Sequence, residues 1–333
     1  MNRLVIMALW LAAVRPGGTA VFEELFAIEP SARGWRSFGD ATLFQWNSTN
    51  EQLEVTWDSS RTNSFFYQSL GTILTKADDF SVSFDLRLRD IRAGATPGKT
   101  NEFEIAIGLL NYWSATNANA FRGAGVSSMY GVRNLVEFDY FPDAGFGDTV
   151  ATTVVSTNNR IFPVHNFPLT LTVGATFRVT LVYSASNQVL RTLATRNGQP
   201  FGLPPDNTLG DLLLAGRPDF RVDSFAVISY SDAIQIGAPE YHGSVLAHGT
   251  VDNVEVVWPD APVAGMKLQF FAGASRVEFT SRTNWIYRLE RTADFDLWVP
   301  SSLSAGGTGG TLTLTDTNPP ASSLFYRVRA ERP

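Results

Sequence analysis

The sequence of 333 residues contains no cysteine and only three histidines, His165, His242 and His248. Without cysteine the protein has no disulfide, no thiolate metal site and no thiol redox chemistry. The histidines lie far apart, and none belongs to an HxH or HExxH pair, which argues against a zinc site and a histidine base. A chain of this length can bury enough surface to fold without disulfides.

Motifs of other enzyme classes are also missing. The sequence has no GxSxG elbow, and "GVSSMYG" lacks the strand-to-helix setting that a serine nucleophile needs. The stretch "GGTGG" has no strand, loop and helix around it to form a phosphate cradle, so it predicts a hairpin turn. Serine-hydrolase and phosphate-loop chemistry therefore have no support.

Long apolar runs are absent except for one, which extends from Leu4 to Val14 after the basic Arg3 and is followed by small residues up to Ala20. This run is too short to span a bilayer but suits a secretory signal. The alternative is a buried N-terminal helix. We expect residues 1–20 to be a signal peptide and the mature protein to be secreted or to lie at the surface of a bacterial cell.

Basic side chains are fewer than acidic ones, with 26 Lys and Arg against 32 Asp and Glu. Such a surface repels nucleic acid and anionic lipid, so we expect neither nucleic-acid binding nor membrane insertion. The charge is also uneven: residues 21–261 carry 16 basic and 26 acidic side chains, whereas residues 262–333 carry 8 and 6. This asymmetry supports two domains.

Helical patterns are scarce, and strand patterns dominate. In "DDFSVSFDLRLRD" the apolar residues from Phe80 to Leu88 alternate strictly with polar ones, which predicts a strand with one buried face. The run "TFRVTLVYS" repeats the pattern. The other predicted strands of this region are "QLEVTW", "NSFFYQSL", "EFEIAIGLL", "NLVEFDYF", "TVATTVVS", "FPLTLTV", "QVLRTLAT", "SFAVISYS" and "VDNVEVVW".

These strands predict an all-β protein with a large antiparallel jelly-roll sandwich over residues 21–260. The proline- and glycine-containing step "WPDAPVAG" predicts a linker at 261–265. Short strands such as "RVEFT", "TLTLTD" and "FYRVRA" follow it. They predict a small immunoglobulin- or fibronectin-like β-sandwich over residues 266–333.

Residues 22–258 resemble the concanavalin A-like lectin/glucanase superfamily. The resemblance depends on the opening "VFEELF" with the aromatic strands after it, on the central "VEFDYF" and on the closing "GTVDNVEVVWP". It implies a jelly roll and a carbohydrate ligand.

Residues 266–333 resemble the small C-terminal sandwich of secreted planctomycete- and verrucomicrobia-type proteins. This second resemblance depends on "YRLERTADFDLWVP", "GGTLTLTDTNPPA" and "FYRVRA". It implies an accessory or sorting domain without chemistry of its own.

A carboxylate pair lies in the central strand of the first resemblance. Retaining laminarinase-type enzymes of the superfamily present Glu, Asp and Glu along one strand, and here Glu137 and Asp139 match the nucleophile and the residue that tunes it. The third position falls on Phe141 or Pro142, neither of which transfers a proton, and Asp143 follows in a turn. The resemblance therefore implies an incomplete catalytic set.

A further carboxylate could come from a neighbouring strand. In "NEFEIAIGLLN" Glu104 alternates with apolar residues, and directly opposed residues of paired strands lie about 4.5–5.5 Å apart. If the two strands pair, Glu104 could therefore reach Glu137, and the cluster could raise one carboxyl pKa. The alternative is a hydrated polar face with arginine partners such as Arg87, Arg133 and Arg178.

Aromatic and amide side chains that suit sugar binding follow the same strand. The segment "LLNYWSATNANAFRG" offers Asn111, Tyr112, Trp113, Asn117 and Asn119, and Phe141 adds an aromatic ring on the carboxylate face. The alternative is that the rings of the segment close the edge of the core. Four other tryptophans lie in strand patterns and are expected in the core, namely Trp35, Trp46, Trp57 and Trp258.

Calcium is the one cofactor that the sequence suggests. Jelly-roll carbohydrate modules hold structural Ca²⁺ between the first and last strands with oxygen ligands. Glu23 and Glu24 open the domain and Asp252 closes it, without a motif of fixed spacing. The alternative is that these charges discourage association at the sheet edge.

The sequence thus predicts a secreted, lectin-like protein that binds a polysaccharide or glycoconjugate without cleaving it. We expect ligand contacts on the face bearing Glu104, Glu137, Asp139 and Phe141, and ligand-binding roles for Asn111, Tyr112, Trp113 and Arg133. One alternative is a glycoside hydrolase or lyase that uses the three carboxylates. A second alternative is a structural adhesion or matrix protein.

Overall fold

The computed structural model describes residues 19–100, 103–116, 132–143, 147–231, 243–259, 262–271, 273–283, 285–293, 297–320 and 325–331. The chain divides into two compact units, one comprising Val21–Trp258 and the other including Pro259–Pro333. Among the helices of these described ranges, none combines the length and the hydropathy needed to cross a membrane.

The larger unit is built almost entirely from strands. Its helical elements are η1 (Pro30–Arg33), η2 (Ala41–Leu43) and α1 (Tyr112–Ala115). Its strands are β1 (Thr19–Glu24), β2 (Arg36–Phe38), β3 (Phe44–Asn47), β4 (Gln52–Asp58), β5 (Ser64–Thr75), β6 (Phe80–Ala93), β7 (Ile105–Leu110), β8 (Leu135–Phe141), β9 (Thr149–Val155), β10 (Ile161–Asn166), β11 (Phe177–Ser184), β12 (Val189–Arg196), β13 (Gln199–Pro200), β14 (Leu212–Leu213), β15 (Arg221–Ser229) and β16 (Val245–Pro259).

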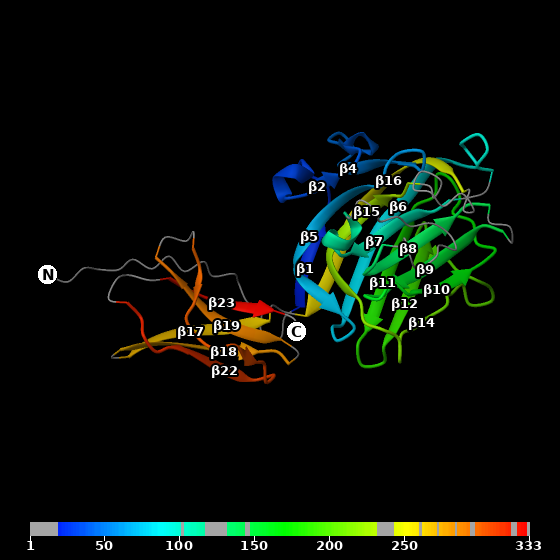
Figure 1. Ribbon diagram of the computed structural model, residues 1–333. Coiled ribbons are helices and arrows are strands. Elements are labelled where there is room, and N and C mark those ends of the chain that lie inside the picture. The colour runs from blue at the N-terminus through cyan, green and yellow to red at the C-terminus, as the bar shows by residue number, and fades with distance from the viewer. Residues whose placement is uncertain are drawn as a thin grey trace. The chain divides into compact units, whose positions relative to one another are not determined.

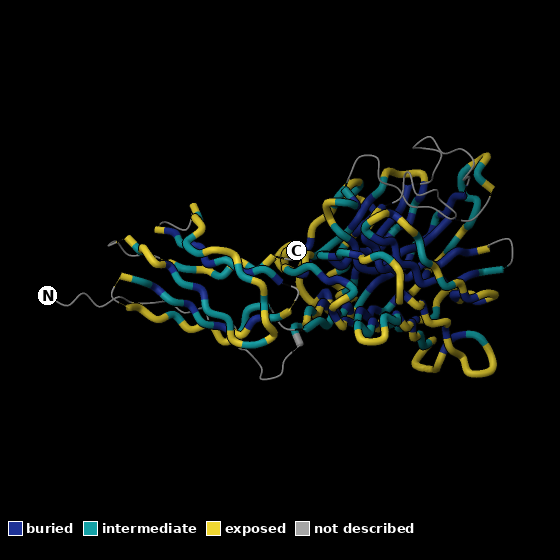
Figure 2. The backbone as a smooth tube through the Cα atoms, turned by 60° about the horizontal axis from the view of Figure 1, so that its bottom comes forward, coloured by how far each residue is buried: buried dark blue, intermediate teal, exposed yellow. Residues whose placement is uncertain are grey.

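Two antiparallel sheets form this unit (Figure 1). One has seven strands in the order β10-β9-β8-β7-β15-β5-β2. The other has nine, in the order β13-β12-β11-β6-β16-β4-β3, with β1 paired to β16 and β14 to β12. Their facing sides enclose a single large hydrophobic core, and buried backbone fills the inside of the unit in Figure 2. The predicted all-β jelly-roll sandwich is confirmed.

Strict alternation explains how these strands pack. Phe80, Val82, Phe84, Leu86 and Leu88 are at most 4% exposed, while the polar residues between them point away from the core. Successive side chains of a strand point to opposite faces, so one face of β6 enters the core. Burial of each such side chain stabilises the fold by about 1.5–3 kcal/mol.

One strand prediction in this unit was wrong, and a neighbouring strand was missed. The run "FPLTLTV" is not a strand, because Pro168 has no N–H to donate and the Leu169 N–H donates instead to the Asp148 carbonyl oxygen at 2.7 Å. Directly before it, the unpredicted strand β10 pairs with β9 from Ile161 to Asn166. Its burial pattern is irregular, which hides it from a search for alternation.

The smaller unit contains two short sheets. Its strands are β17 (Val263–Phe271), β18 (Ala274–Ser281), β19 (Ile286–Thr292), β20 (Val299–Pro300), β21 (Ala305–Gly306), β22 (Thr311–Asp316) and β23 (Phe325–Glu331). One sheet has the order β17-β18-β22, and the other joins β20, β21 and β23 to β19. The core of the unit consists of Val277, Phe279, Trp285, Tyr287, Leu289 and Leu314.

The predicted linker at 261–265 overlaps strand β17, which begins at Val263 and pairs there with Ser281. The pairing shifts between Ala264 and Lys267, and Gly265 between them has a φ of +62°. A glycine in the left-handed region is typical of a β-bulge. The Pro-Gly step that suggests a linker in the sequence is therefore partly a bulge inside a strand.

A buried carboxylate organises the outer side of the second small sheet. Glu290, on β19, has a side chain 2% exposed and accepts hydrogen bonds from Arg288 at 2.9 Å and from Arg327 at 2.7 Å. Arg329 lies 3.6 Å away. Burial opposes ionisation of Glu290, but the hydrogen bonds from Arg327 and Arg288 outweigh it, and the pKa of the carboxyl group lies below its ordinary value.

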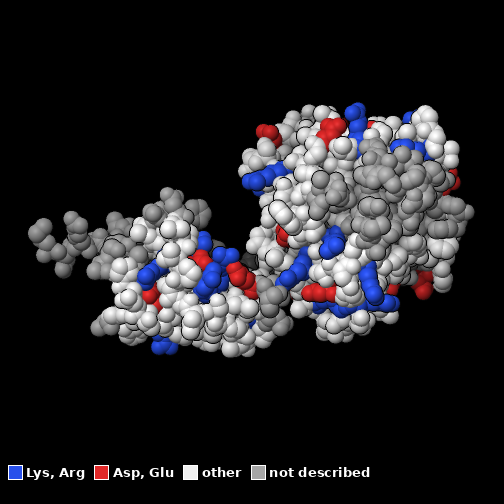
Figure 3. Space-filling model, in the orientation of Figure 1, with Lys and Arg blue, Asp and Glu red and all other residues white. Residues whose placement is uncertain are grey.

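Basic and acidic side chains both occur on the visible face of each unit (Figure 3).

Strand β7 approaches β8 closely at Gly108. A Cβ atom added there would lie 2.3 Å from the Val136 carbonyl oxygen and 2.7 Å from the Glu137 Cα. Both are backbone atoms of a paired strand and cannot move aside cheaply. Only glycine fits at this position.

We predict that Gly108→Ala destabilises the larger unit by about 3 kcal/mol, because overpacking of a closed interior forces the strands apart. Urea unfolding followed by circular dichroism measures the change. Gly306→Ala is the control, since a Cβ there meets nothing within 4 Å. Equal unfolding midpoints for the two variants would contradict the close approach.

Candidate functional site

The carboxylate pair lies on the outer face of the seven-stranded sheet. Phe138 points inward, where its ring meets Phe84 of the other sheet at 5.9 Å, so Glu137 and Asp139 point outward. In the register of β7 with β8, Glu137 lies opposite Gly108 and Asp139 opposite Ala106. Small neighbours thus surround both carboxylates.

These carboxylates are buried. Glu137 and Asp139 are 0% exposed and Glu104 is 1% exposed. The Tyr230 hydroxyl donates to Glu137 Oε2 at 2.9 Å, and the Thr153 hydroxyl donates to Asp139 Oδ2 at 2.5 Å. Because these side chains have almost no exposed surface, their burial does not support ligand contacts on this acidic face, and those contacts stay a prediction.

The register also corrects the expected position of Glu104. Strands β7 and β8 pair as anticipated, but Ile105 lies opposite Tyr140, which places Glu104 level with Phe141. Phe141 is four residues from Glu137 along β8. At a rise of about 3.3 Å per residue, the backbone at Glu104 is therefore displaced from that at Glu137 by about 13 Å along the strand direction. The two carboxylates are not directly opposed.

The arginines considered as partners of this face lie elsewhere. Arg178 and Arg87 belong to the nine-stranded sheet, where Arg178 pairs with Asp85 and Arg87 donates to the Gly174 carbonyl oxygen. Arg133 is exposed in the bend before β8. The buried carboxylates are therefore satisfied partly by hydroxyl groups, which suits a structural network.

Phe141 is 7% exposed and lies against the His165 ring at 6.3 Å between centroids. The ligand contact expected at Phe141 likewise stays a prediction. Asn117 and Asn119 lie outside the described residues.

Aromatic side chains gather beyond the end of β7. We call the half-buried Tyr67 and the exposed Tyr112 and Trp113 the aromatic corner. Trp113 is 84% exposed and Tyr112 is 37% exposed. The Tyr112 ring stacks on Tyr67 of β5, with centroids 4.7 Å apart and planes at 29°. The alternative that these residues close the core is wrong for Trp113.

Of the four tryptophans expected in the core, Trp35 and Trp57 are buried, and Trp46 and Trp258 are half-buried against it.

A polar brace fixes the turn that carries these rings. Asn111 caps α1: its Oδ1 accepts from the Ser114 N–H at 3.0 Å, and its Nδ2 donates to Asp223 at 2.9 Å. The Tyr112 N–H donates to the same Asp223 carboxylate at 3.0 Å. The amide of Asn111 thus holds the turn, and the ligand contact expected at this residue stays a prediction.

The phenol of Tyr67 lies between a tyrosine and an arginine. Burial and the neighbouring Tyr112 raise the pKa of Tyr67 to about 12, and the Arg36 guanidinium opposes the shift. Arg36 lies directly opposite Tyr67 in the pairing of β2 with β5. The corner therefore combines aromatic faces, phenol hydroxyls and a cation, which together suit a hydroxyl-rich ligand.

The residues expected to hold calcium have other partners. Glu24 is buried and accepts from the Phe26 N–H at 2.8 Å and the Trp35 indole N–H at 2.9 Å. Glu23 is exposed, and Asp252 lies in β16. In the described part of the chain no group of three or more His, Asp or Glu side chains could hold a metal ion. Calcium binding stays a prediction that these contacts do not support.

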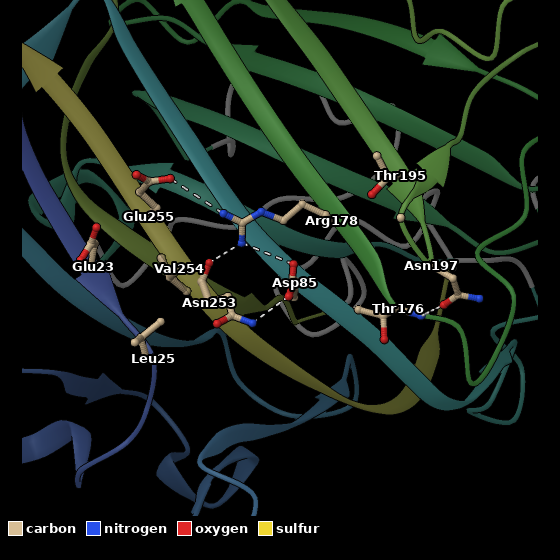
Figure 4. A pocket seen from close by; sticks show the side chains of 11 residues that line it. Glu23, Leu25, Asp85, Thr176, Arg178, Thr195, Asn197, Asn253, Val254 and Glu255 are labelled. Atoms are coloured by element: carbon tan, nitrogen blue, oxygen red, sulfur yellow. Dashed lines mark hydrogen bonds and ion pairs between the residues drawn. The ribbon is translucent and has the colours of Figure 1, made fainter.

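A groove of about 700 Å³ crosses the nine-stranded sheet (Figure 4). Its floor is a network around Arg178, which lies 3.4 Å from Asp85 and 3.9 Å from Glu255 and donates to the Asn253 carbonyl oxygen. Asp252 lies beside Asn253 at this groove. Burial raises the pKa of the Asp252 carboxyl group, and the negative charge of Asp85 raises it further. The residues that line the groove are Glu23, Leu25, Asp85, Thr176, Arg178, Thr195, Asn197, Gly198, Asn253, Val254 and Glu255. This lining has no aromatic ring, so it suits a sugar less well than the aromatic corner.

Comparison with known proteins yields structural matches alone. No protein-family model and no curated protein match the chain. Peanut lectin with a nine-residue peptide is 15% identical, with a TM-score of 0.44 over 73% of this chain and 100% of the lectin. Bacillus licheniformis β-glucanase is 10% identical, with a TM-score of 0.39 over 74% and 100%. Basic winged bean lectin with Tn antigen is 12% identical, with a TM-score of 0.39 over 73% and 100%.

These matches are two lectins and a β-glucanase, in agreement with the resemblance of residues 22–258 to the concanavalin A-like lectin/glucanase superfamily. Because every one of these TM-scores is below 0.5, the assignment of the fold depends on the sheet order and register of this chain itself.

We predict that Tyr230→Phe lowers the free energy of unfolding by about 1–3 kcal/mol, because it leaves a buried carboxylate oxygen of Glu137 without its donor. Urea unfolding of Tyr230→Phe, Glu137→Gln and the double variant forms a double-mutant cycle. Additive losses would show that the two side chains do not interact.

We predict that Asn111→Ala loosens the turn α1. Loss of an N-cap costs about 1 kcal/mol, which corresponds to roughly fivefold faster exchange of the Ser114 amide hydrogen. Hydrogen exchange followed by NMR measures the rate. Asn47→Ala, at the last residue of β3, is the control, because the Asn47 side chain accepts from the Thr49 and Asn50 N–H groups, which are far from Ser114 in the sequence. An unchanged Ser114 rate in Asn111→Ala would refute the brace.

Proposed function

We propose that the unit Val21–Trp258 binds a polysaccharide or glycoconjugate at the aromatic corner and does not cleave it. The observation that carries the proposal is the exposure of Trp113, 84%, next to the stacked pair of Tyr67 and Tyr112. Large aromatic side chains are mostly buried in soluble proteins, so an exposed one held on a braced turn favours a binding role.

The chemistry of a pyranose ring fits this corner. Its C–H groups form apolar faces that pack on aromatic rings, while its hydroxyls need donors and acceptors at the rim. The two tyrosine hydroxyls and the Arg36 guanidinium supply such groups. The turn is held in place before the ligand arrives, which reduces the entropy lost on binding.

The buried carboxylates are the reason for proposing binding without cleavage. Hydrolysis of a glycosidic bond needs two carboxyl groups flanking that bond, about 5–5.5 Å apart for retention or 6.5–9.5 Å for inversion. Glu137 and Asp139 are enclosed and hydrogen-bonded to Tyr230 and Thr153. They support the sheet beneath the corner instead.

We propose that the protein acts outside the cytoplasm. The support is the apolar run Leu4–Val14 with its basic start, which suits an export signal. An exported protein without cysteine keeps its fold in an oxidising compartment without disulfide exchange. The smaller unit is proposed as an accessory domain.

We predict that Trp113→Ala weakens glycan binding about tenfold or more, since it removes an aromatic stacking surface. The wild-type protein is first screened on a glycan array, and affinities for the glycans it retains are measured by isothermal titration calorimetry. Phe270→Ala is the control, because Phe270 is also exposed, at 69%, but belongs to the smaller unit.

Absence of saturable binding to any glycan would overturn the proposed function. Equal weakening by the two substitutions would overturn the placement of the site. Prolonged incubation with each bound polysaccharide, followed by an assay for new reducing ends or unsaturated products, tests cleavage. Product that accumulates with time would overturn the non-catalytic part of the proposal.

A further inference from the structure

An exposed arginine lies on one side of the aromatic corner. Arg36 is on β2, the edge strand of the seven-stranded sheet, directly opposite Tyr67 of β5. Directly opposed residues share a face of the sheet, with Cβ atoms about 4.5–5.5 Å apart. The guanidinium is close enough to the Tyr67 phenol to affect its pKa, so it lies at the rim of the stacked rings.

A second exposed arginine lies on the other side. Arg133 directly precedes Asn134, whose carbonyl oxygen accepts the Asn111 N–H at 3.0 Å. Asn111 is the cap of the turn that carries Tyr112 and Trp113. The pairing of β8 with β7 thus brings Arg133 to the start of this turn. In the order of the sheet, β7 and β5, which position Tyr112 and Tyr67, lie between β8 and β2.

Neither arginine has a carboxylate within 4.0 Å among the residues that the structure describes. Some other arginines of the unit do have such a partner: Arg33 pairs with Glu24, Arg178 with Asp85 and Arg191 with Asp211. The acid at the corner, Asp223, accepts from Asn111, from the Tyr112 N–H and from Ser224. The charge of Asp223 serves the brace. The Arg36 guanidinium hydrogen-bonds to the Tyr67 phenol, and the other N–H donors of Arg36 and those of Arg133 have no carboxylate partner among the described residues.

We infer that the glycan bound at the aromatic corner is anionic and carries carboxylate or sulfate groups that pair with Arg36 and Arg133. This inference rests on the proposed function and names its class of ligand. A guanidinium offers a planar fork of donors that matches the oxygens of a carboxylate or a sulfate, and aromatic faces beside it take the sugar ring. Two cations on opposite sides of the rings suit a polymer that repeats its charge along the chain.

Nucleic acid is the other polymer that combines repeated negative charge with flat rings. The chain carries a net charge of −6, which repels every polyanion at long range and repels the densely charged nucleic-acid backbone most strongly. An acidic polysaccharide is therefore favoured, and single-stranded DNA is included in the test as a competitor.

The test uses the full mature chain and pairs of polymers that differ in charge. One pair is polygalacturonate and its methyl ester, and the other is κ-carrageenan and its desulfated form. We expect at least one charged polymer to bind about tenfold more tightly than its neutral partner, because charge-assisted hydrogen bonds are about twice as strong as neutral ones. The pair that shows the difference identifies carboxylate or sulfate as the source of the charge.

The variants are Arg36→Gln, Arg133→Gln and the double variant, with Arg92→Gln as the control. Arg92 is also exposed but belongs to β6 of the other sheet. The double variant should bind the charged and neutral polymers equally, while Arg92→Gln should keep the preference. Arg36→Lys should restore part of the preference, because lysine keeps the charge but not the planar fork. Thermal unfolding midpoints confirm that the variants are folded.

The possible outcomes separate this inference from the proposed function. Equal affinity of the wild-type protein for charged and neutral polymers, with both lost in Trp113→Ala, would overturn the inference and leave carbohydrate binding in place. A preference that survives in the double variant would overturn the assigned arginines. Tighter binding of single-stranded DNA than of every polysaccharide would overturn the ligand class. Failure of all four polymers to bind would overturn the inference, whereas the proposed function is overturned only if the glycan array also shows no saturable binding.

Discussion

A charge removed from water must be hydrogen-bonded inside the protein, and this constraint decides where the larger unit can bind a ligand. Alternation along β8 sends its apolar side chains into the core and Glu137 and Asp139 to the opposite face, where small residues leave room for Tyr230 and Thr153 to donate to them. Side chains in the middle of the sheet thus form hydrogen bonds within the protein. Groups that reach solvent lie at the ends and edges of the strands instead.

The aromatic corner is one such place. Strand β7 ends at Leu110, and the chain turns at once through α1, so that its next side chains leave the sheet. The turn does not depend on packing of its own, because Asn111 and Asp223 tie it to the end of β15. A short, polar brace of this kind allows a tryptophan to stay exposed while its backbone remains fixed.

Much of the fold could be predicted from the sequence, because one-sided burial imprints a two-residue period on strands such as Phe80–Ala93. The same period correctly put Glu137 and Asp139 on one face. It could not show that this face is buried too, because that depends on what covers the sheet, and not on the strand itself. The register was equally hidden: the opposition of Gly108 to Glu137 is set by the whole sheet, and it moved Glu104 away from the expected partner. Arg36 was missed because a three-residue edge strand shows no period.

The position of β2 at the rim of the sheet affects how the protein would sit on a long polymer. Only β2 lies beyond β5 in the sheet. A polysaccharide that contacts Tyr67 on β5 and Arg36 on β2 therefore leaves the sheet at its edge. Recognition would then involve a few consecutive sugars in the interior of the polymer, with no requirement for a free terminus. Successive copies could occupy one strand of polysaccharide side by side, and the amount of protein bound would scale with polymer length.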